Sequence, residues 1–227
     1  MELVIGNKLF SSWSLRPWLV LAAFDIPFSE TMVVLRQADT AARIQAHSPS
    51  GKVPVLIDGD VVVWESLAII EYLAERHPDR AIWSQDAKAR AHARAISSEM
   101  HAGFQALRQA CPMNLGKRFA PKDRGAGAQA DIARIVALWA DARARFGAGG
   151  PFLYGAFSAA DAMYAPVVTR LDTYQIAVDD GTRRYMDAML AHPAFVRWRT
   201  AALAETWAID ALEAGETVVE VFLKPAH

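Results

Sequence analysis

Three serines stand within four residues, at Ser11, Ser12 and Ser14, directly before an apolar stripe with helical spacing. A helix N-terminus has unpaired backbone N–H groups and a partial positive charge, and it therefore stabilises an anion. The same frame holds a Cys-x-x-Cys pair in dithiol redox proteins, but here it holds no sulfur. A serine hydroxyl can instead donate a charge-assisted hydrogen bond of roughly 1.5–3 kcal/mol to the thiolate of a bound molecule. The pattern thus excludes dithiol chemistry and leaves thiolate stabilisation or simple helix capping.

A second polar pair, Glu65-Ser66, stands where an apolar strand meets a helical pattern. One interpretation is structural, with Ser66 as the helix N-cap and Glu65 favoured by the helix dipole. The other is a receptor for the two ends of an amino acid. Ser66 and the helix N–H groups would bind its carboxylate, and Glu65 its ammonium group.

Between these motifs, the segment 48–56 enters a strand at Pro54. Proline donates no hydrogen bond to a sheet, so it is expected at a strand start or edge. If the Val53-Pro54 bond is cis, the main-chain N–H and C=O of Val53 face outward and can pair with a peptide ligand. The sequence leaves the isomer open.

The elements that position these motifs follow from the hydrophobic periodicity. An Asp58-Gly59 pair between two β-branched runs predicts a hairpin. The order β-α-β-α-β-β-α over the first ~80 residues predicts a mixed sheet with helices on its faces. The expected strands are 3–5, 30–35, 53–57 and 61–64, and the expected helices are 15–22, 40–46 and one that begins at 65–66.

After residue 79 the pattern is helical, and no strand is expected before the tail. Ser158 and Asp161 form a capping box that begins a helix reaching Tyr174. Two shorter helices surround His192-Pro193, and 216–223 is expected to be extended. We therefore predict an α/β domain, 1–78, followed by an all-helical domain, 86–227. The two long helices before Ser158 carry Ile96, Met100, Phe104, Leu107 and Cys111 on the first, and Ile132, Ile135, Trp139 and Phe146 on the second.

The composition of the 227-residue chain narrows the class of partner. Lys and Arg (24) balance Asp and Glu (25) without a basic stripe, which argues against nucleic acid and against a polybasic membrane anchor. Cys111 is the single cysteine, so no intrachain disulfide forms, and six histidines show no metal-binding spacing. With no signal-peptide pattern and no membrane-length apolar run, we expect a cytoplasmic protein without a metal.

Taken together and in order, these motifs resemble the glutathione S-transferase superfamily. The run from Val53 to Leu56, followed by Asp-Gly and Glu65-Ser66-x-Ala-Ile, is similar to its N-terminal domain. The segment 11–16, Ser-Ser-Trp-Ser-Leu-Arg, resembles the Ser-Ser-Cys-x-x-Arg motif of serine-type zeta members, close to theta-like bacterial members. The resemblance implies a thioredoxin-like N-terminal domain, a C-terminal α-helical bundle, glutathione as co-substrate and a homodimer.

The resemblance also implies roles for individual residues. Ser11 is the candidate for activating the glutathione thiolate, and Ser12 is its closest rival. Val53 would pair main chain to main chain with the cysteinyl unit. Glu65 and Ser66 would bind the γ-glutamyl end.

Further positions follow from the same comparison. Lys52 would face the glycine carboxylate, and Pro54 is the family's cis-proline. Arg16 matches the family arginine and either raises the local positive potential or pairs with a carboxylate. Trp13 stands where zeta members carry Cys, so the zeta isomerisation of maleylacetoacetate does not follow directly. Gln105 is placed like a zeta-class ligand-contacting glutamine.

The function implied is a transferase in which the thiolate attacks a small electrophile. A glutathione-dependent isomerase or peroxidase uses the same thiolate with another acceptor, and a non-catalytic binding or regulatory protein of this fold is a further alternative. Ser11, Glu65 and Ser66 favour an enzyme. Sequence does not separate the reactions, because acceptor choice depends on the lining of the interdomain cleft, to which segments 97–101 and 112–114 are candidates to contribute.

Overall fold

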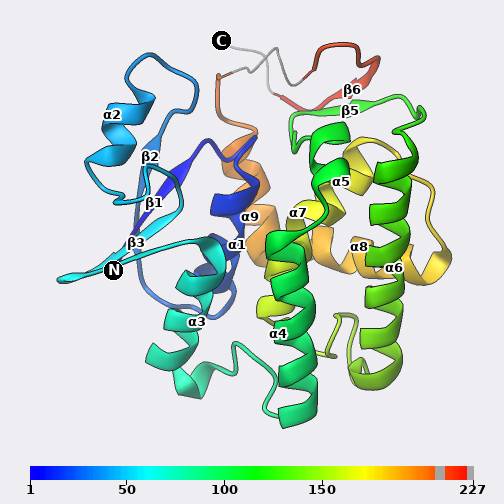
Figure 1. Ribbon diagram of the computed structural model, residues 1–227, viewed down its shortest axis with the longest axis horizontal. Coiled ribbons are helices and arrows are strands. Elements are labelled where there is room, and N and C mark those ends of the chain that lie inside the picture. The colour runs from blue at the N-terminus through cyan, green and yellow to red at the C-terminus, as the bar shows by residue number, and fades with distance from the viewer. Residues whose placement is uncertain (208–212, 224–227) are drawn as a thin grey trace.

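The computed structural model describes residues 1–207 and 213–223, and its N-terminal part is built on a four-stranded sheet in the order β2-β1-β3-β4 (Figure 1). β1 runs parallel to β2 and antiparallel to β3, which pairs with β4 across the predicted hairpin. The mixed sheet is therefore confirmed. Its strands are β1 (Glu2–Gly6), β2 (Ser29–Val33), β3 (Val55–Asp58) and β4 (Val61–Trp64), and its helices are α1 (Ser12–Ala23), α2 (Thr40–Gln45) and α3 (Ser66–Arg76).

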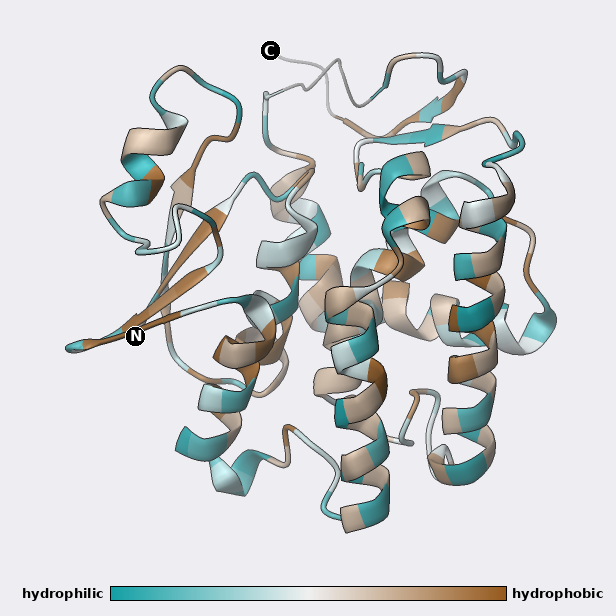
Figure 2. Cartoon of the chain, viewed as in Figure 1, coloured by the Kyte–Doolittle hydropathy of each residue, from teal (hydrophilic) through white to brown (hydrophobic). Residues whose placement is uncertain are grey.

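Alternation along β1 divides the core of this sheet between its two faces. Leu3 and Ile5 belong to the large core cluster that includes α1 and α3, and Val4 belongs to a small cluster with Ile44 of α2. All three β1 side chains are fully buried, and Figure 2 shows the strands as hydrophobic along their length. The start of α1 is thus fixed at the edge of a buried strand.

The C-terminal part is a helical bundle around one buried helix, α7. α7 packs against both α1 and α4, which joins the two parts of the molecule. No helix within the described ranges is long and apolar enough to cross a membrane. The helices are α4 (Ala87–Ala102), α5 (Gln105–Ala110), α6 (Ala126–Phe146), α7 (Ala159–Thr173), α8 (Asp180–Ala191) and α9 (Pro193–Ala202), preceded by the 3₁₀ turn η1 (Pro78–Arg80).

The single long helix predicted through Met100, Phe104 and Leu107 is wrong, because the chain breaks between α4 and α5. Gly103 is extended and Phe104 has a positive φ of 62°. The Arg108 guanidinium donates to the Met100 carbonyl and, at 3.0 Å, to the Gly103 carbonyl. The side chain thereby satisfies carbonyl groups that the break releases from the helix.

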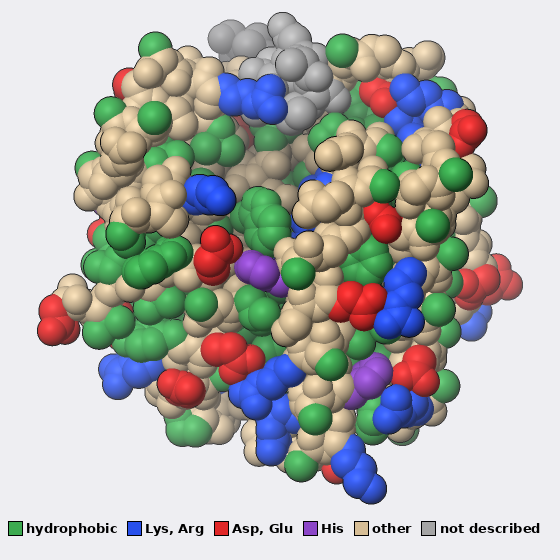
Figure 3. All heavy atoms as spheres, viewed as in Figure 1, with side chains coloured by type: hydrophobic (Ala, Val, Ile, Leu, Met, Phe, Trp, Pro, Cys, Tyr) green, Lys and Arg blue, Asp and Glu red, His purple; other side chains and the backbone are tan. Residues whose placement is uncertain are grey.

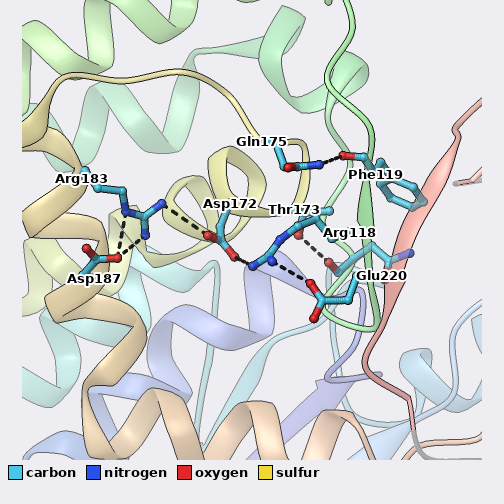
Figure 4. Close-up of polar contacts among 9 residues, drawn as sticks. Arg118, Phe119, Asp172, Thr173, Gln175, Arg183, Asp187 and Glu220 are labelled. Carbon is cyan, nitrogen blue, oxygen red and sulfur yellow. Dashed lines mark hydrogen bonds and ion pairs between the residues drawn. The ribbon is translucent and has the colours of Figure 1, made fainter.

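The expectation of no strand between residue 79 and the tail is also wrong. β5 (Lys117–Phe119) pairs antiparallel with β6 (Val218–Val221), which lies within the extended tail predicted from the sequence. Figure 4 shows how Arg118 of β5 bridges Asp172 of α7 and Glu220 of β6. Three residues are too few to show a period of two, and this strand is held in place by distant partners.

The predicted capping box at the start of α7 is present. The Asp161 carboxylate accepts from the Ser158 N–H and hydroxyl, both at 2.9 Å, and from the Leu153 N–H at 3.0 Å. Asp161 is fully buried, and burial raises the pKa of this carboxyl to about 6. The box therefore ties the α6–α7 connection to the central helix.

Asp161→Ala is expected to lower the free energy of unfolding by about 2–4 kcal/mol, because it removes a cap and leaves a buried Leu153 N–H without its acceptor. Urea unfolding at pH 7 measures this loss. Asp179→Ala, at the more exposed cap of α8, serves as the comparison and should cost about 1 kcal/mol. Equal losses at the two caps would contradict the assigned role of Asp161.

Candidate functional site

A cavity of about 220 Å³ opens beside the start of α1. It combines residues from three places in the chain: the start of α1, the loop before β3 and the residue before α3. The space-filling view shows this face hollowed between the two parts of the molecule, with basic side chains around the hollow (Figure 3). The cavity is lined by Trp13, Ser50, Lys52, Val53, Pro54 and Glu65. Apart from Ser50, all of these were singled out from the sequence.

The residues before α3 have an unusual backbone. Glu65 has a φ of 69°, in the left-handed region that side chains other than glycine rarely adopt. Its carboxylate lies 3.5 Å from His101 Nε2 of α4. The Val53-Pro54 bond, on the opposite wall of the cavity, is cis.

The structural alternative for Ser66, the N-cap of α3, is not what the structure shows. Glu65 holds the cap position and makes no side-chain cap bond, and Ser66 is the first helical residue. Ser66 is fully buried, and its Oγ has no hydrogen-bond partner among the described residues. A buried hydroxyl without a partner is costly, so this atom is suited to a ligand group.

The serines before α1 have different environments. Ser11 is the N-cap: its Oγ accepts from the Ser14 N–H at 3.4 Å and donates to Ser14 Oγ at 2.7 Å. Ser14 Oγ also accepts from the Gly6 N–H at 3.1 Å. Ser12 Oγ instead accepts from Arg170 Nη2 of α7 at 3.2 Å. Both candidate hydroxyls are buried, but they face different partners.

Trp13 lies between two arginines. The guanidinium carbon of Arg16 is 4.3 Å from the Trp13 ring centre, and that of Arg108 is 4.8 Å from it. His101 contacts the same ring edge-on, with ring centres 5.2 Å apart. Such cation–π contacts contribute about 0.5–2 kcal/mol each. Trp13 therefore both lines the cavity and screens two buried cations from each other.

Arg16 is fully buried, and its Nε donates to the Met163 carbonyl at 3.1 Å. Its two terminal nitrogens have no partner, and it forms no ion pair within the described ranges. Burial lowers the pKa of Arg16 well below its ordinary value, and the charges of Arg108 and Arg170 lower it further. Of the two alternatives for Arg16, this environment fits the raising of local positive potential.

A second cavity, of about 370 Å³, lies on the other side of the α1 start. Its lining combines four apolar side chains with three arginines: Phe10, Leu35, Pro112 and Met113, with Arg36, Arg108 and Arg170. Pro112 and Met113 belong to a segment that the sequence placed at the cleft. The arginines were missed, although a lone charge within the apolar run 165–171 was a usable signal for Arg170.

The loop between β1 and α1 is held by the segment that follows α9, which sequence reasoning also missed. The Glu205 carboxylate accepts from the Lys8 N–H at 2.7 Å and from the Leu9 N–H at 3.2 Å. Trp198 Nε1 of α9 donates to the Lys8 carbonyl at 3.1 Å. These contacts fix the loop that leads into the serines.

Gln105, predicted to contact ligand, is exposed at the first position of α5 and lines neither cavity. Lys52 is exposed at the rim of the first cavity. Within the described ranges, no group of three or more His, Cys, Asp or Glu side chains is arranged to hold a metal ion.

Comparison with known proteins agrees with this geometry. A model of the glutathione S-transferase N-terminal domain matches residues 10–76, and one of the C-terminal domain matches residues 85–201. The chain therefore belongs to the glutathione S-transferase family, and its fold is the thioredoxin-like sheet followed by the helical bundle of that family.

Among curated relatives, the probable maleylacetoacetate isomerase of Caenorhabditis elegans is 36% identical over 119 residues, 52% of this chain and 54% of that protein. The chain thus spans about half the length of this relative. The maleylacetoacetate isomerase of Pseudomonas aeruginosa is 30% identical over 159 residues, 66% of this chain and 72% of that protein.

Two solved structures show the same fold. A glutathione transferase homologue from Burkholderia with bound glutathione has a TM-score of 0.68 at 21% identity, and the match covers 88% of this chain and 97% of that one. A bacterial maleylpyruvate isomerase of the zeta class has a TM-score of 0.64 at 23% identity, covering 89% and 98%.

The environment of His101 predicts an acid sensitivity. Burial lowers the pKa of His101, and the charges of Arg16 and Arg108 lower it further, against an opposing contribution from Glu65. Between the lowered folded pKa and the ordinary value near 6.5, the unfolded chain binds the extra proton. The free energy of unfolding should therefore rise with pH through this window and fall as the pH drops below 6.5.

Urea unfolding at pH 5 and pH 7.5 measures this dependence. His101→Gln should lose less stability between the two pH values than wild type does. His47→Gln, a histidine outside this cluster, should keep the wild-type dependence. An unchanged dependence in His101→Gln would contradict the assignment.

Proposed function

We propose that this protein is a glutathione-dependent enzyme that binds the tripeptide in the 220 Å³ cavity and uses its thiolate against a small electrophile. The observation that carries the proposal is the buried Ser66 hydroxyl without a partner, placed beside the strained Glu65. Strain at a non-glycine residue is typical of ligand sites. Together the two residues offer one acceptor for an ammonium group and one donor for a carboxylate.

The remaining contacts follow from the cavity lining. Ser66 Oγ and the first N–H groups of α3 would bind the γ-glutamyl carboxylate, and Glu65 its ammonium group. The Val53 main chain would pair with the cysteinyl unit, with Pro54 at the strand start. Lys52, at the rim, is a cation for the glycine carboxylate.

The sulfur of a peptide bound this way would lie near the start of α1. The N–H groups of this helix, a serine hydroxyl and Arg16 all favour the thiolate over the thiol. The thiol proton leaves to solvent, the sulfur forms a bond to an electrophilic carbon, and the leaving group departs with the electron pair of the broken bond. The protein forms no covalent bond in this reaction.

A second candidate reaction is isomerisation, with glutathione regenerated. The relatives named as maleylacetoacetate isomerases favour it, and so do the three arginines of the second cavity, which suit a carboxylate-bearing substrate. In this reaction the thiolate adds to a double bond, the new single bond rotates, and the thiolate is eliminated. A peroxidase reaction would use the same thiolate, but no feature of the second cavity favours it.

The proposal includes two further expectations, a cytoplasmic location and a homodimer composed of domains 1–78 and 86–227. Large apolar side chains of β4 are exposed, with Val61 and Val62 at 40% and Trp64 at 43%. A second copy of the chain would cover this apolar surface. A concentration-independent monomer mass in solution would contradict the dimer.

Calorimetry with glutathione near neutral pH tests the site. Wild type should bind with a dissociation constant in the micromolar-to-millimolar range, and Glu65→Ala and Ser66→Ala should each weaken binding about tenfold or more, since each loses a hydrogen bond to a charged group. Glu75→Ala, near the other end of α3, should bind like wild type. Absence of binding by wild type would contradict the proposal and favour a non-catalytic role.

Product analysis separates the two reactions. With a cis-configured unsaturated dicarboxylic acid and substoichiometric glutathione, an isomerase should convert all of the acid to the trans form, as proton NMR would show. A transferase would stop when the glutathione is consumed. Arg108→Gln should raise the KM for the anionic acid, because it removes a cation from the second cavity.

A further inference from the structure

Two buried side chains from distant parts of the chain meet at the start of α1. Arg170, in the middle of α7, is 5% exposed, and Ser12, the first residue of α1, is 7% exposed. Arg170 Nη2 lies 3.2 Å from Ser12 Oγ. The role of this contact is not explained by helix capping, which Ser11 already performs.

The direction of this hydrogen bond determines where the Ser12 proton points. A guanidinium group has donors only, so Ser12 Oγ must be the acceptor. The Ser12 proton is therefore directed away from Arg170, and within the described ranges it has no acceptor. Ser11 differs, because its proton is donated to Ser14 Oγ at 2.7 Å. Of the two hydroxyls, only that of Ser12 has a proton available to a ligand without breaking an internal bond.

Arg170 is itself fixed in place. Its Nη1 donates to the Cys111 carbonyl and, at 3.4 Å, to the Arg108 carbonyl, both near the end of α5. Burial lowers the pKa of Arg170 to about 10, with a further contribution from Arg108, so it is charged at neutral pH. A rigid cation therefore sets the orientation of the Ser12 hydroxyl.

Ser12 also lies between the two cavities. Its neighbour Trp13 lines the first cavity, and Arg170 and Phe10 line the second. A sulfur that reaches from the first cavity towards an electrophile in the second must pass the start of α1. Arg16, Arg108 and Arg170 form no ion pair with any residue in 1–207 or 213–223, so negative charge at this point is unopposed by protein carboxylates in direct contact.

We propose that Ser12, rather than Ser11, donates the hydrogen bond to the glutathione thiolate, and that Arg170 is a positioning residue that holds the Ser12 hydroxyl in its donor orientation. This inference rests on the proposed function. It assigns to Arg170, from the helical part of the molecule, an effect on thiol ionisation in the site of the other part.

The experiment measures the ionisation of bound glutathione directly, by thiolate absorbance near 240 nm as a function of pH, in the full chain. In wild type the thiol should titrate below its ordinary value of about 8.5. Ser12→Ala should raise this pKa by about one to two units, the equivalent of one charge-assisted hydrogen bond. Arg170→Gln should raise it in the same direction, and the acid limb of kcat/KM should move with it in both variants.

Three further variants distinguish positioning from folding. Arg170→Lys keeps the charge but cannot bond Ser12 and Cys111 together, so it should raise the thiol pKa while preserving the fold. Ser12→Ala combined with Arg170→Gln should show no more shift than the larger single change. Arg90→Gln removes an arginine that also donates to two main-chain carbonyls, far from the site, and should leave the thiol pKa unchanged.

The outcomes separate this inference from the proposed function. A wild type that binds glutathione as the thiol would overturn both. A wild-type thiolate that is kept by Ser12→Ala but lost in Ser11→Ala would overturn only the assignment of Ser12. Arg170 variants that unfold more easily but keep the wild-type thiol pKa would reduce Arg170 to a structural role and overturn its positioning function.

Discussion

Positive charge buried without a contacting carboxylate is the constraint around which this site is organised. Arg16, Arg108 and Arg170 are close enough for Arg108 and Arg170 to lower the pKa of Arg16, yet none has an acidic side chain in direct contact within the described ranges. Burial of a charge is costly unless other groups solvate it. Main-chain carbonyls and the face of Trp13 supply part of that solvation. A bound anion would supply the rest, and this gives the site its selectivity for negative charge.

Each part of the fold contributes one of these cations. Arg16 comes from α1, Arg108 reaches Trp13 because the chain breaks at Gly103, and Arg170 arrives through the packing of α7 on α1. The loop before α1 is in turn fixed by Glu205. The site therefore exists only when the sheet and the bundle are assembled, which explains why neither part contains complete catalytic machinery on its own.

Features encoded by neighbouring residues were predictable from the sequence. The hairpin at Asp58-Gly59, the capping box of α7 and the Glu65-Ser66 pair all depend on contacts within a few positions. The break at Gly103 was not, because the apolar spacing continues through it and the compensating donor is the Arg108 side chain. Strand β5 is set by its pairing with a segment about 100 positions away. The choice between Ser11 and Ser12 depends on Arg170, a contact over 158 positions that no local pattern reports.

The most direct test is a crystal structure of the protein with bound glutathione. The account predicts that the γ-glutamyl end contacts Glu65 and Ser66, and that the sulfur lies within hydrogen-bond distance of Ser12 Oγ while Arg170 keeps its bond to the same oxygen. Glutathione bound outside the cavity beside Trp13, or a sulfur on Ser11 with the Ser12 hydroxyl turned away, would contradict it.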